Sequence, residues 1–239
     1  MTLTPPRLVI LSGAGLSAES GVPTFRGSDG LWEGHRIEDV ATPEAFKRQP
    51  ELVHRFYNLR RAALKTVEPN AAHLALARME AAWPGAFLHV TQNVDDLNER
   101  AGSTKLLHMH GELKKVRCLW CRCVLPWSEE VEVTTPCPEC SRSGKLRPDI
   151  VWFGEMPYYI DEITRALQTA DLFICIGTSG MVYPAAGFVR LAGEMGCERR
   201  IEVNLDATGI SGQFTEQRLG PATVEVPRLV EELLSEAGF

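Results

Sequence analysis

Apolar and polar residues follow two alternating patterns along most of this 239-residue chain. Short runs rich in aliphatic and β-branched residues are typical of buried parallel strands, and they occupy 7–12, 86–91, 105–108, 172–176 and 201–204. Apolar residues at helical spacing predict helices that open near residues 16 and 42 and helices over 51–65, 70–80, 161–169, 185–195 and 227–235. This alternation predicts an α/β fold with a Rossmann-like, doubly wound parallel sheet.

Two of the helix starts carry capping residues. Thr42 precedes Pro43, and Asn70 precedes an apolar helical pattern, which are the residue types preferred at the first turn. Residues 21–35, in contrast, contain four glycines and a proline with little periodicity. We expect a loop there, and a loop of that length in a compact domain usually serves a site.

The alternation is interrupted at 112–149, where two pairs of cysteines and four prolines gather. A typical domain has about 150 residues, so the length fits one large domain with insertions. We therefore expect a Rossmann-type ligand-binding domain built from 1–41, 83–111 and 150–239. A helical insertion at 42–82 and a small metal-binding module at 112–149 would form a smaller domain.

Composition excludes several classes of protein. The fractions of apolar residues, 44%, and charged residues, 23%, are ordinary for a globular protein and argue against disorder. The net charge is −6 and no basic stripe exists, so we expect no direct nucleic-acid partner. No apolar run approaches the ~20 residues of a membrane span, and no secretory signal is evident. We expect a cytoplasmic protein without membrane contact, and a monomer.

The cysteines indicate a metal site. Cys118-x2-Cys121 and Cys137-x2-Cys140 are separated by fifteen residues, the spacing of two knuckles that close on one tetrahedral zinc ion. Four thiolates complete the coordination sphere of zinc, so the site would be structural and would hold one ion. Disulfides or free thiols are the alternative, and Cys123 competes with Cys121 as a ligand.

Candidate ligand-binding residues follow the predicted strands. The glycine turn at 13–15 follows the first strand and opens a helix, so its amides can face a pyrophosphate; the alternative is a tight turn without a ligand. The clusters at 92–95 and 177–179, and Asn204, end three further strands. Ligands bind at this edge of a doubly wound sheet, although Asp95 could instead cap a helix.

His110 is the best placed of the six histidines to act as a base. It lies between the strand predicted at 105–108 and the cysteine module, and imidazole titrates near neutral pH. A structural role is the alternative. His108 shares the same strand face, and spacing alone does not choose between the two histidines.

Tyr57 and Arg60 are three residues apart on the helix predicted at 51–65, so they project from one face. A hydroxyl beside a guanidinium fork would bind a carboxylate at the end of a substrate. The spacing by itself favours the alternative, a surface arginine beside a partly buried tyrosine.

The order of these motifs resembles that of the sirtuin family, NAD-dependent protein-lysine deacylases. From Leu8 to about Val226 the chain carries, in order, GAGLSAESGVPTFRG, TQNVDDL, HMHGE, the paired cysteines, PDIVWFGE, GTSG and an asparagine after the next strand. Such a series is more specific than any single motif. The stretch YNLR, which contains Tyr57 and Arg60, resembles the bacterial class III branch, whose tyrosine and arginine bind acidic acyl groups such as succinyl and malonyl.

The resemblance implies a role for each of these residues. His110 would be the base that acts on the ribose, with Asn93 and Asp95 beside the nicotinamide and the ribose. Acyl-lysine peptides would contact Tyr57, Arg60, Val151 and Phe153, and would add as a strand to residues 150–154. The residues expected to contact NAD are Gly13, Ala14, Gly15, Ser17, Ala18, Phe25, Arg26, Trp32, Gln92, Asn93, Asp95, Gly177, Thr178, Ser179, Asn204, Asp206 and Ala222. The expected zinc ligands are Cys118, Cys121, Cys137 and Cys140.

The implied reaction consumes NAD as a co-substrate. The acyl oxygen attacks the ribose carbon as nicotinamide leaves, and His110 then removes a ribose hydroxyl proton so that the acyl group moves to ADP-ribose. Free lysine, nicotinamide and acyl-ADP-ribose are the products, the substrates are acetyl-lysine and also succinyl-lysine or malonyl-lysine, and the zinc takes no chemical part. The alternatives are protein mono-ADP-ribosyl transfer, NAD sensing without turnover, and a nicotinamide oxidoreductase.

Overall fold

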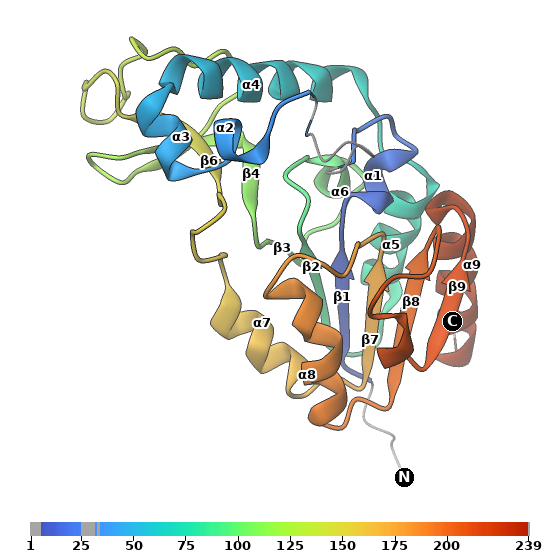
Figure 1. Cartoon of the computed structure of the whole chain (residues 1–239). Helices are drawn as coiled ribbons and strands as arrows, with labels where there is room; N and C mark the ends of the chain where they lie inside the picture. Colours follow the sequence, from blue (N-terminus) through green and yellow to red (C-terminus); the bar gives the residue numbers. More distant parts are fainter. Residues whose placement is uncertain (1–5, 25–31, 33, 239) are drawn as a thin grey trace.

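The computed structural model describes residues 6–24, 32 and 34–238, and its largest element is a six-stranded sheet (Figure 1). The strands pair in the order β3-β2-β1-β7-β8-β9, and every pairing is parallel. This order is that of a doubly wound Rossmann-type sheet, so the predicted fold is confirmed. The strands are β1 (Leu8–Ser12), β2 (Phe87–Thr91), β3 (Leu106–His108), β7 (Leu172–Ile176), β8 (Arg199–Asn204) and β9 (Glu216–Leu219).

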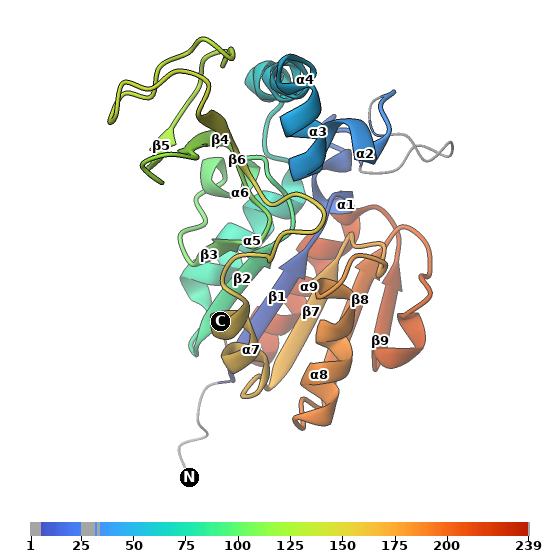
Figure 2. The same ribbon diagram turned by 60° about the vertical axis from the view of Figure 1, so that its left-hand side comes forward.

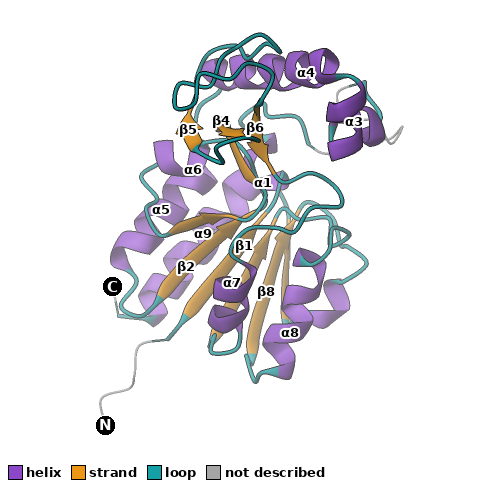
Figure 3. Ribbon diagram, turned by 90° about the vertical axis from the view of Figure 1, so that its left-hand side faces the viewer, coloured by secondary structure: helices purple, strands orange, loops and turns teal. Residues whose placement is uncertain are grey.

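Helices cover both faces of this large sheet (Figure 3). On one face lie α5 (Ala71–Ala82) and α9 (Ala222–Glu236), and on the other lie α7 (Ile160–Leu167) and α8 (Phe188–Glu194). The central strands β1 and β7 are buried along their whole length. Their sequences are apolar almost throughout because both faces pack against helices.

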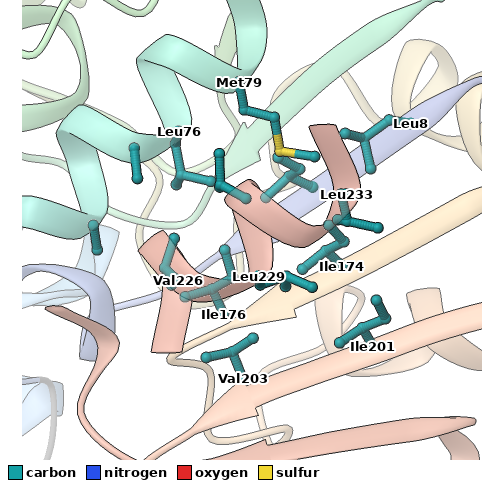
Figure 4. Close-up of a cluster of buried hydrophobic side chains, with 14 of the residues drawn as sticks. Leu8, Leu76, Met79, Ile174, Ile176, Ile201, Val203, Val226, Leu229 and Leu233 are labelled. Carbon is teal, nitrogen blue, oxygen red and sulfur yellow. The ribbon is translucent and has the colours of Figure 1, made fainter. Parts of the chain in front are cut away.

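The layer between α5, α9 and the sheet is a continuous apolar core. Leu76 and Met79 of α5 meet Leu229 and Leu233 of α9 above Ile174 of β7 (Figure 4). Burying each such side chain contributes about 1.5–3 kcal/mol. The carboxyl ends of the strands are therefore a rigid platform.

A second, antiparallel sheet with the order β5-β4-β6 lies above the carboxyl ends of the large sheet (Figure 2). It consists of β4 (Gly111–Cys118), β5 (Val124–Pro126) and β6 (Leu146–Ile150). The sequence did not predict it. The register of β4 against β6 shifts between Glu112 and Val116, which interrupts the alternation that would have marked a strand.

Three helices pack on this small sheet: α2 (Ile37–Val40), α3 (Pro43–Arg48) and α4 (Pro50–Ala63). Thr42 Oγ1 accepts a hydrogen bond from the Ala45 amide at 3.0 Å, which confirms the predicted cap. An apolar cluster joins these helices to the small sheet, and its largest members are Trp32, Phe46, Phe56, Tyr57, Leu113 and Trp152.

Some predicted boundaries differ from the structure. Helix α5, which lies within the segment 42–82, packs in the core of the large sheet. Helix α9 begins at Ala222, and Pro227 lies within it rather than at its start. Strand β9 was missed because its sequence is polar at the sheet edge. The remaining short elements are α1 (Gly15–Ala18), η1 (Leu64–Thr66), α6 (Leu97–Arg100), η2 (Ala185–Gly187) and η3 (Ser211–Gln213).

The division of the chain into the three segments at 42–82, at 112–149 and elsewhere stays a prediction. Among the described helices, none is long and apolar enough to cross a membrane.

Candidate active site

A cleft of about 1240 Å³ lies between the carboxyl edge of the large sheet and the part of the chain that carries α4 and β6. Open α/β sheets bind ligands at this edge, where the strand order reverses. The cleft brings together every predicted substrate, cofactor and catalytic residue that the structure describes. These residues are Gly13, Ala14, Gly15, Ser17, Ala18, Trp32, Tyr57, Arg60, Gln92, Asn93, Asp95, His110, Val151, Phe153, Gly177, Thr178, Ser179, Asn204, Asp206 and Ala222. Phe25 and Arg26 lie outside the described residues.

The turns after β1 and β7 interlock at the point where the strand order reverses. The Gly13 amide donates to the Ile176 carbonyl and the Gly15 amide donates to the Gly177 carbonyl, each at 2.9 Å. A Cβ on Gly15 would lie 2.6 Å from the Gly177 Cα, so no side chain fits between the two turns. The two backbones can approach closely only because both turns contain glycine.

A polar network forms the floor of the cleft. Ser17 Oγ lies 3.0 Å from Asp95 Oδ2, 3.1 Å from Asn93 Nδ2 and 3.3 Å from His73 Nε2. His73 Nδ1 accepts from the Asn70 amide at 3.2 Å, so Nε2 carries the proton and donates to Ser17. Ser17 therefore accepts from His73 and Asn93, and its hydroxyl donates to Asp95.

The protonation states in this network follow from burial. Burial lowers the pKa of His73 to about 4, so its imidazole is neutral at pH 7. Burial also raises the pKa of Asp95, while hydrogen bonds from Leu97 and Ser17 oppose that shift. The Asp95 carboxyl is thus held at a defined angle in a site that disfavours its charge unless a cation comes near.

His110 lines the cleft, and the structure separates it from His108. Its Nδ1 lies 3.2 Å from the Gln92 carbonyl, which can only accept, so Nδ1 is the donor and Nε2 is free of a proton in the neutral ring. Burial lowers the pKa of His110, which favours that neutral form. A base at Nε2 is the chemical group that this geometry supplies.

His108 lies behind the cleft lining, where its ring contacts Asn93 and Glu99. Nδ1 is 3.0 Å from the Asn93 carbonyl oxygen and Nε2 is 2.6 Å from Glu99 Oε1. The two histidines that the sequence left as alternatives therefore have different neighbours, and of the two only His110 is among the residues that line the cavity.

The far end of the cleft combines aromatic rings with one guanidinium. Tyr57 is buried, and its hydroxyl accepts a hydrogen bond from Trp152 Nε1 at 2.9 Å. The Arg60 Cζ lies 4.1 Å from the centre of the Trp32 ring, a cation–π contact. Burial raises the pKa of Tyr57, so its hydroxyl stays protonated. This end of the cleft offers a positive charge and a hydroxyl in an apolar wall.

The structure corrects the strand expected at 150–154. Strand β6 ends at Ile150, because the Trp152 amide turns to donate to Glu155 Oε2 at 2.8 Å. The Val151 amide donates to the His110 carbonyl at 2.9 Å. Phe153 is exposed at the cleft, so residues 151–154 line the cavity as an irregular segment.

The four predicted metal ligands lie together in the small sheet. Their sulfur atoms all lie within 4.8 Å of one another, with 3.7 Å between Cys118 and Cys140 and 3.8 Å between Cys121 and Cys137. Tetrahedral zinc with bonds of about 2.3 Å requires edges of about 3.8 Å, so the cluster is compatible with a structural zinc ion. Cys123 lies only 3.3 Å from Cys121, which is shorter than such an edge. None of these cysteines lines the cleft.

Two residues of the site were missed from the sequence. In the sequence, His73 is simply the third residue of a capped helix. No spacing rule indicates that its Nε2 reaches Ser17. Trp152 lies within the motif PDIVWFGE, yet its partner Tyr57 is 95 positions away. Contacts of that kind appear only once the fold is known.

Comparison with known proteins agrees with this arrangement. The Sir2 family profile matches residues 13–184. An NAD-dependent protein deacylase of Bdellovibrio bacteriovorus is 60% identical over 229 residues, which cover 95% of this chain and 96% of that protein. An NAD-dependent protein deacylase of Escherichia coli is 55% identical over 231 residues, which cover 96% of this chain and 82% of that protein.

Solved structures give the same result. A Sir2 homolog in complex with NAD superposes with a TM-score of 0.86 at 39% identity, covering 96% of this chain and 90% of the other. A Sir2 protein with a p53 peptide and NAD superposes with a TM-score of 0.78 at 28% identity, covering 97% and 93%. The chain belongs to the Sir2 family.

Proposed function

We propose that this chain is an NAD-dependent protein-lysine deacylase that transfers acetyl groups, and also succinyl or malonyl groups, from lysine to ADP-ribose. The observation that carries the proposal is the position of His110. Its Nε2 is free to accept a proton, in a cleft whose floor is a glycine turn with a polar network and whose far end holds Tyr57 and Arg60. The relatives and solved structures with NAD support the same reaction.

Each part of the cleft has a task in this reaction. The interlocked glycine turns leave room for a pyrophosphate close to the backbone. Asn93 and Asp95 place an amide and a carboxyl where positive charge develops on the sugar as nicotinamide leaves. His110 Nε2 accepts the proton of the ribose hydroxyl that takes the acyl group. NAD, when bound, supplies the ribose that accepts the acyl group.

We propose that Tyr57 and Arg60 select acidic acyl chains. Arg60 is more than nine-tenths buried, so its charge is weakly screened and attracts an anion more strongly than a surface arginine does. An acetyl group lacks the terminal carboxylate of a succinyl or malonyl group and cannot use this contact. The same apolar wall, with Trp32 and Trp152, still accepts the acetyl methyl group.

Zinc would be held by Cys118, Cys121, Cys137 and Cys140 and would act only on the structure, because four thiolates leave no open position. Cysteines that are arranged for a metal rather than for disulfides are consistent with a cytoplasmic protein. We further propose that the enzyme works as a monomer without nucleic acid or membrane, because one chain supplies both walls of the cleft. Cell fractionation and light scattering test these two points.

Mass spectrometry of acetyl-lysine and succinyl-lysine peptides, with and without NAD, tests the proposed reaction. We expect NAD-dependent loss of the acyl group, free nicotinamide and acyl-ADP-ribose, all abolished in His110→Tyr. Label from NAD on the protein instead of on acyl-ADP-ribose would indicate ADP-ribosyl transfer. No product in any form would indicate a module that only binds NAD.

The Arg60→Ala variant tests the acyl preference. Loss of a charge-assisted contact should weaken kcat/KM for succinyl-lysine by ~1.5–3 kcal/mol, or roughly 10-fold to 150-fold, and should affect acetyl-lysine much less. Arg55→Ala is the matched control, because Arg55 is exposed on the same helix. Equal losses on both substrates in Arg60→Ala would contradict the assignment.

A further inference from the structure

His108 is held between two groups that can only accept hydrogen bonds. Its Nδ1 faces the carbonyl oxygen of Asn93 at 3.0 Å, and its Nε2 faces a carboxylate oxygen of Glu99 at 2.6 Å. A neutral imidazole has one N–H and can donate to only one of these acceptors. With Glu99 ionised, both contacts are satisfied only in the imidazolium form, with both nitrogens protonated.

The charges around His108 favour this form. Glu99 on α6 and Glu112 on β4 each place a carboxylate oxygen within 4.8 Å of a ring nitrogen of His108 and of each other. Asp95 also interacts with the ring from the loop after β2, whereas the buried His89 on β2 stays neutral because burial lowers its pKa to about 3. Burial lowers the pKa of His108, but the hydrogen bond and charge of Glu99, together with the Asn93 carbonyl and Glu112, more than offset it and raise the pKa above the ordinary value.

A proton, rather than a metal ion, fits between His108 and Glu99. Zinc bound to a nitrogen and an oxygen at about 2.0–2.1 Å would separate those atoms by well over 3 Å. The 2.6 Å separation is that of a short, charge-assisted hydrogen bond.

His108 contacts Asn93, a cleft residue whose backbone and side chain are both held by hydrogen bonds. The Asn93 amide donates to Thr91 Oγ1 at 3.1 Å, and its side-chain Nδ2 donates to Ser17 at 3.1 Å. The carbonyl of the same residue is the acceptor for His108. Asn93 is thereby held at three points, and His108 supplies the only one of the three that carries a charge.

We propose that His108, paired with Glu99, is a positioning residue that holds Asn93 in the NAD site through a charged hydrogen bond to its carbonyl. Binding of NAD then depends on a proton that lies outside the cleft. The proposal rests on the proposed function only for its kinetic consequence. As pH rises through the pKa of His108, the ring keeps the proton on Nε2, which the charged Glu99 carboxylate holds, and loses the proton on Nδ1. The hydrogen bond to the Asn93 carbonyl is then lost, and Asn93 is held less firmly.

Nuclear magnetic resonance of the holoprotein tests the contact without any turnover. The amide nitrogen of Val94 reports hydrogen bonding at the Asn93 carbonyl, because the two atoms share a peptide group. We expect the Val94 signal and the His108 ring signals to change with one midpoint, above the ~6.5 of an ordinary histidine. In Glu99→Gln both midpoints should fall together, by about one pH unit or more.

Two further variants distinguish the effect of the hydrogen bond between Glu99 and His108 from the effect of nearby negative charge. Glu112→Gln removes a nearby carboxylate that instead pairs with Lys115, so we expect a smaller shift of the same sign. His108→Asn keeps an N–H donor near the position of Nδ1 but cannot titrate, so the Val94 signal should become independent of pH. Equal shifts in Glu99→Gln and Glu112→Gln, or a Val94 signal that still titrates in His108→Asn, would overturn the proposal.

Kinetics then shows what the contact does. We expect Glu99→Gln to move the upper limb of the pH profile of kcat/KM for NAD to lower pH, with about a threefold to tenfold loss above that limb. The KM for the acyl peptide should not change. A loss that is equal at all pH values would indicate a purely structural role and would contradict the proposal. If even the wild type shows no deacylation, the proposed function fails, whereas the magnetic resonance titration still decides whether His108 holds Asn93.

Discussion

The large sheet is packed between helices that cover both of its faces with apolar side chains. At the cysteine end of the small sheet, in contrast, the apolar cluster is much smaller. Twenty buried residues form the layer under α5 and α9 alone. The cluster at the cysteine end of the small sheet has five, Val116, Cys118, Val131, Cys137 and Leu146, and two of these are metal-ligand candidates. A core of that size cannot by itself offset the conformational entropy of the loops around it. The other end of the small sheet joins the apolar cluster of α2, α3 and α4. The floor of the cleft is therefore stabilised by packing, whereas its upper wall, the part that carries α4 and β6, also depends on the cysteine cluster and on a few specific contacts.

The two parts meet at the candidate base. His110 follows β3 of the large sheet by two residues, and β4 of the small sheet begins at Gly111. A weakened small sheet should therefore displace His110 and the upper wall while leaving the glycine turns on β1 and β7 in place. Substitutions in the small sheet should therefore affect the two sheets differently.

Removal of the metal site should have the largest effect. Binding of structural zinc contributes about 10 kcal/mol or more, so Cys137→Ser should unfold the small sheet and abolish deacylation. Hydrogen exchange should show lost protection in β4 and β6 and retained protection in β1 and β7. Cys197→Ser, at a buried cysteine outside the cluster, is the control. Equal loss of protection in both sheets would show that the large sheet does not hold its structure independently of the small sheet.

Substitution of Gly111 should come next. Its φ is +83°, and an added Cβ would lie 2.0 Å from the Asp149 carbonyl oxygen in β6. Gly111→Ala must therefore move one strand of the small sheet, at a cost of several kcal/mol, beyond the ~1–2 kcal/mol of the left-handed backbone.

Gly144→Ala is the matched control for that variant. Gly144 has a φ of +68°, yet the nearest atom to an added Cβ is 3.7 Å away. In urea unfolding, Gly144→Ala should lower the free energy of unfolding by only the ~1–2 kcal/mol of the left-handed backbone. Similar losses in the two variants would mean that the contact between Gly111 and β6 does not hold the junction.

The same comparison explains what the sequence could reveal. The central strands of the large sheet were predictable because burial on both faces makes them apolar runs, as in Leu172–Ile176. The helix caps were predictable because a local hydrogen bond decides them, as at Thr42 and Asn70. The small sheet was not, because its order depends on cysteines and on partners far along the chain.

Within the site, residue types and their place after a strand were enough to suggest which residues line the cleft. Their hydrogen bonds were not predictable, because partners such as Ser17 and His73 are separated by 56 positions. The choice between His108 and His110 needed the structure for the same reason. The difference between them lies in Gln92 and Glu99, which no local pattern connects to either ring.

The next contact to test is that of a buried arginine in the upper wall. Arg61 on α4 is 2% exposed, and its guanidinium donates to the Leu113 carbonyl at 3.0 Å and to Asn58 Oδ1 at 2.8 Å. Burial lowers its pKa to about 10, so it remains charged at pH 7. Arg61→Ala would remove the side-chain donor to the Leu113 carbonyl and one of the donors to Asn58 Oδ1, and we expect a loss of about 3 kcal/mol.

The loss should be confined to the upper wall of the cleft. Urea unfolding followed by hydrogen exchange would show α4 and β4 opening before β1 and β7. Arg55→Ala, at an exposed position of the same helix, should change stability by less than about 0.5 kcal/mol. A uniform loss of protection across the two sheets would show that Arg61 does not act on the wall alone.

The smallest effect should appear on mild acidification. His54 on α4 is buried, and burial together with the charge of Arg61 lowers its pKa to about 4. Above pH 6.5 the ring is neutral in both the folded and the unfolded chain and contributes nothing. As pH falls from 6.5 towards 4, the unfolded chain takes up a proton that the folded chain does not, so stability decreases by up to about 1.4 kcal/mol per pH unit.

His54→Gln isolates this contribution. We subtract the unfolding free energy of the variant from that of the wild type, both measured in urea between pH 6.5 and 5. This difference should fall by up to about 1.4 kcal/mol per pH unit, because the contributions of all other titrating groups cancel. In that range ordinary carboxylates remain ionised, so the histidine alone sets the difference. His54 packs against Phe46 in the upper wall, with ring centres 5.2 Å apart, so the change should be seen in α3 and α4 before the large sheet. A difference that does not vary with pH would mean that His54 is open to protons in the folded chain, and that the upper wall is looser than its packing implies.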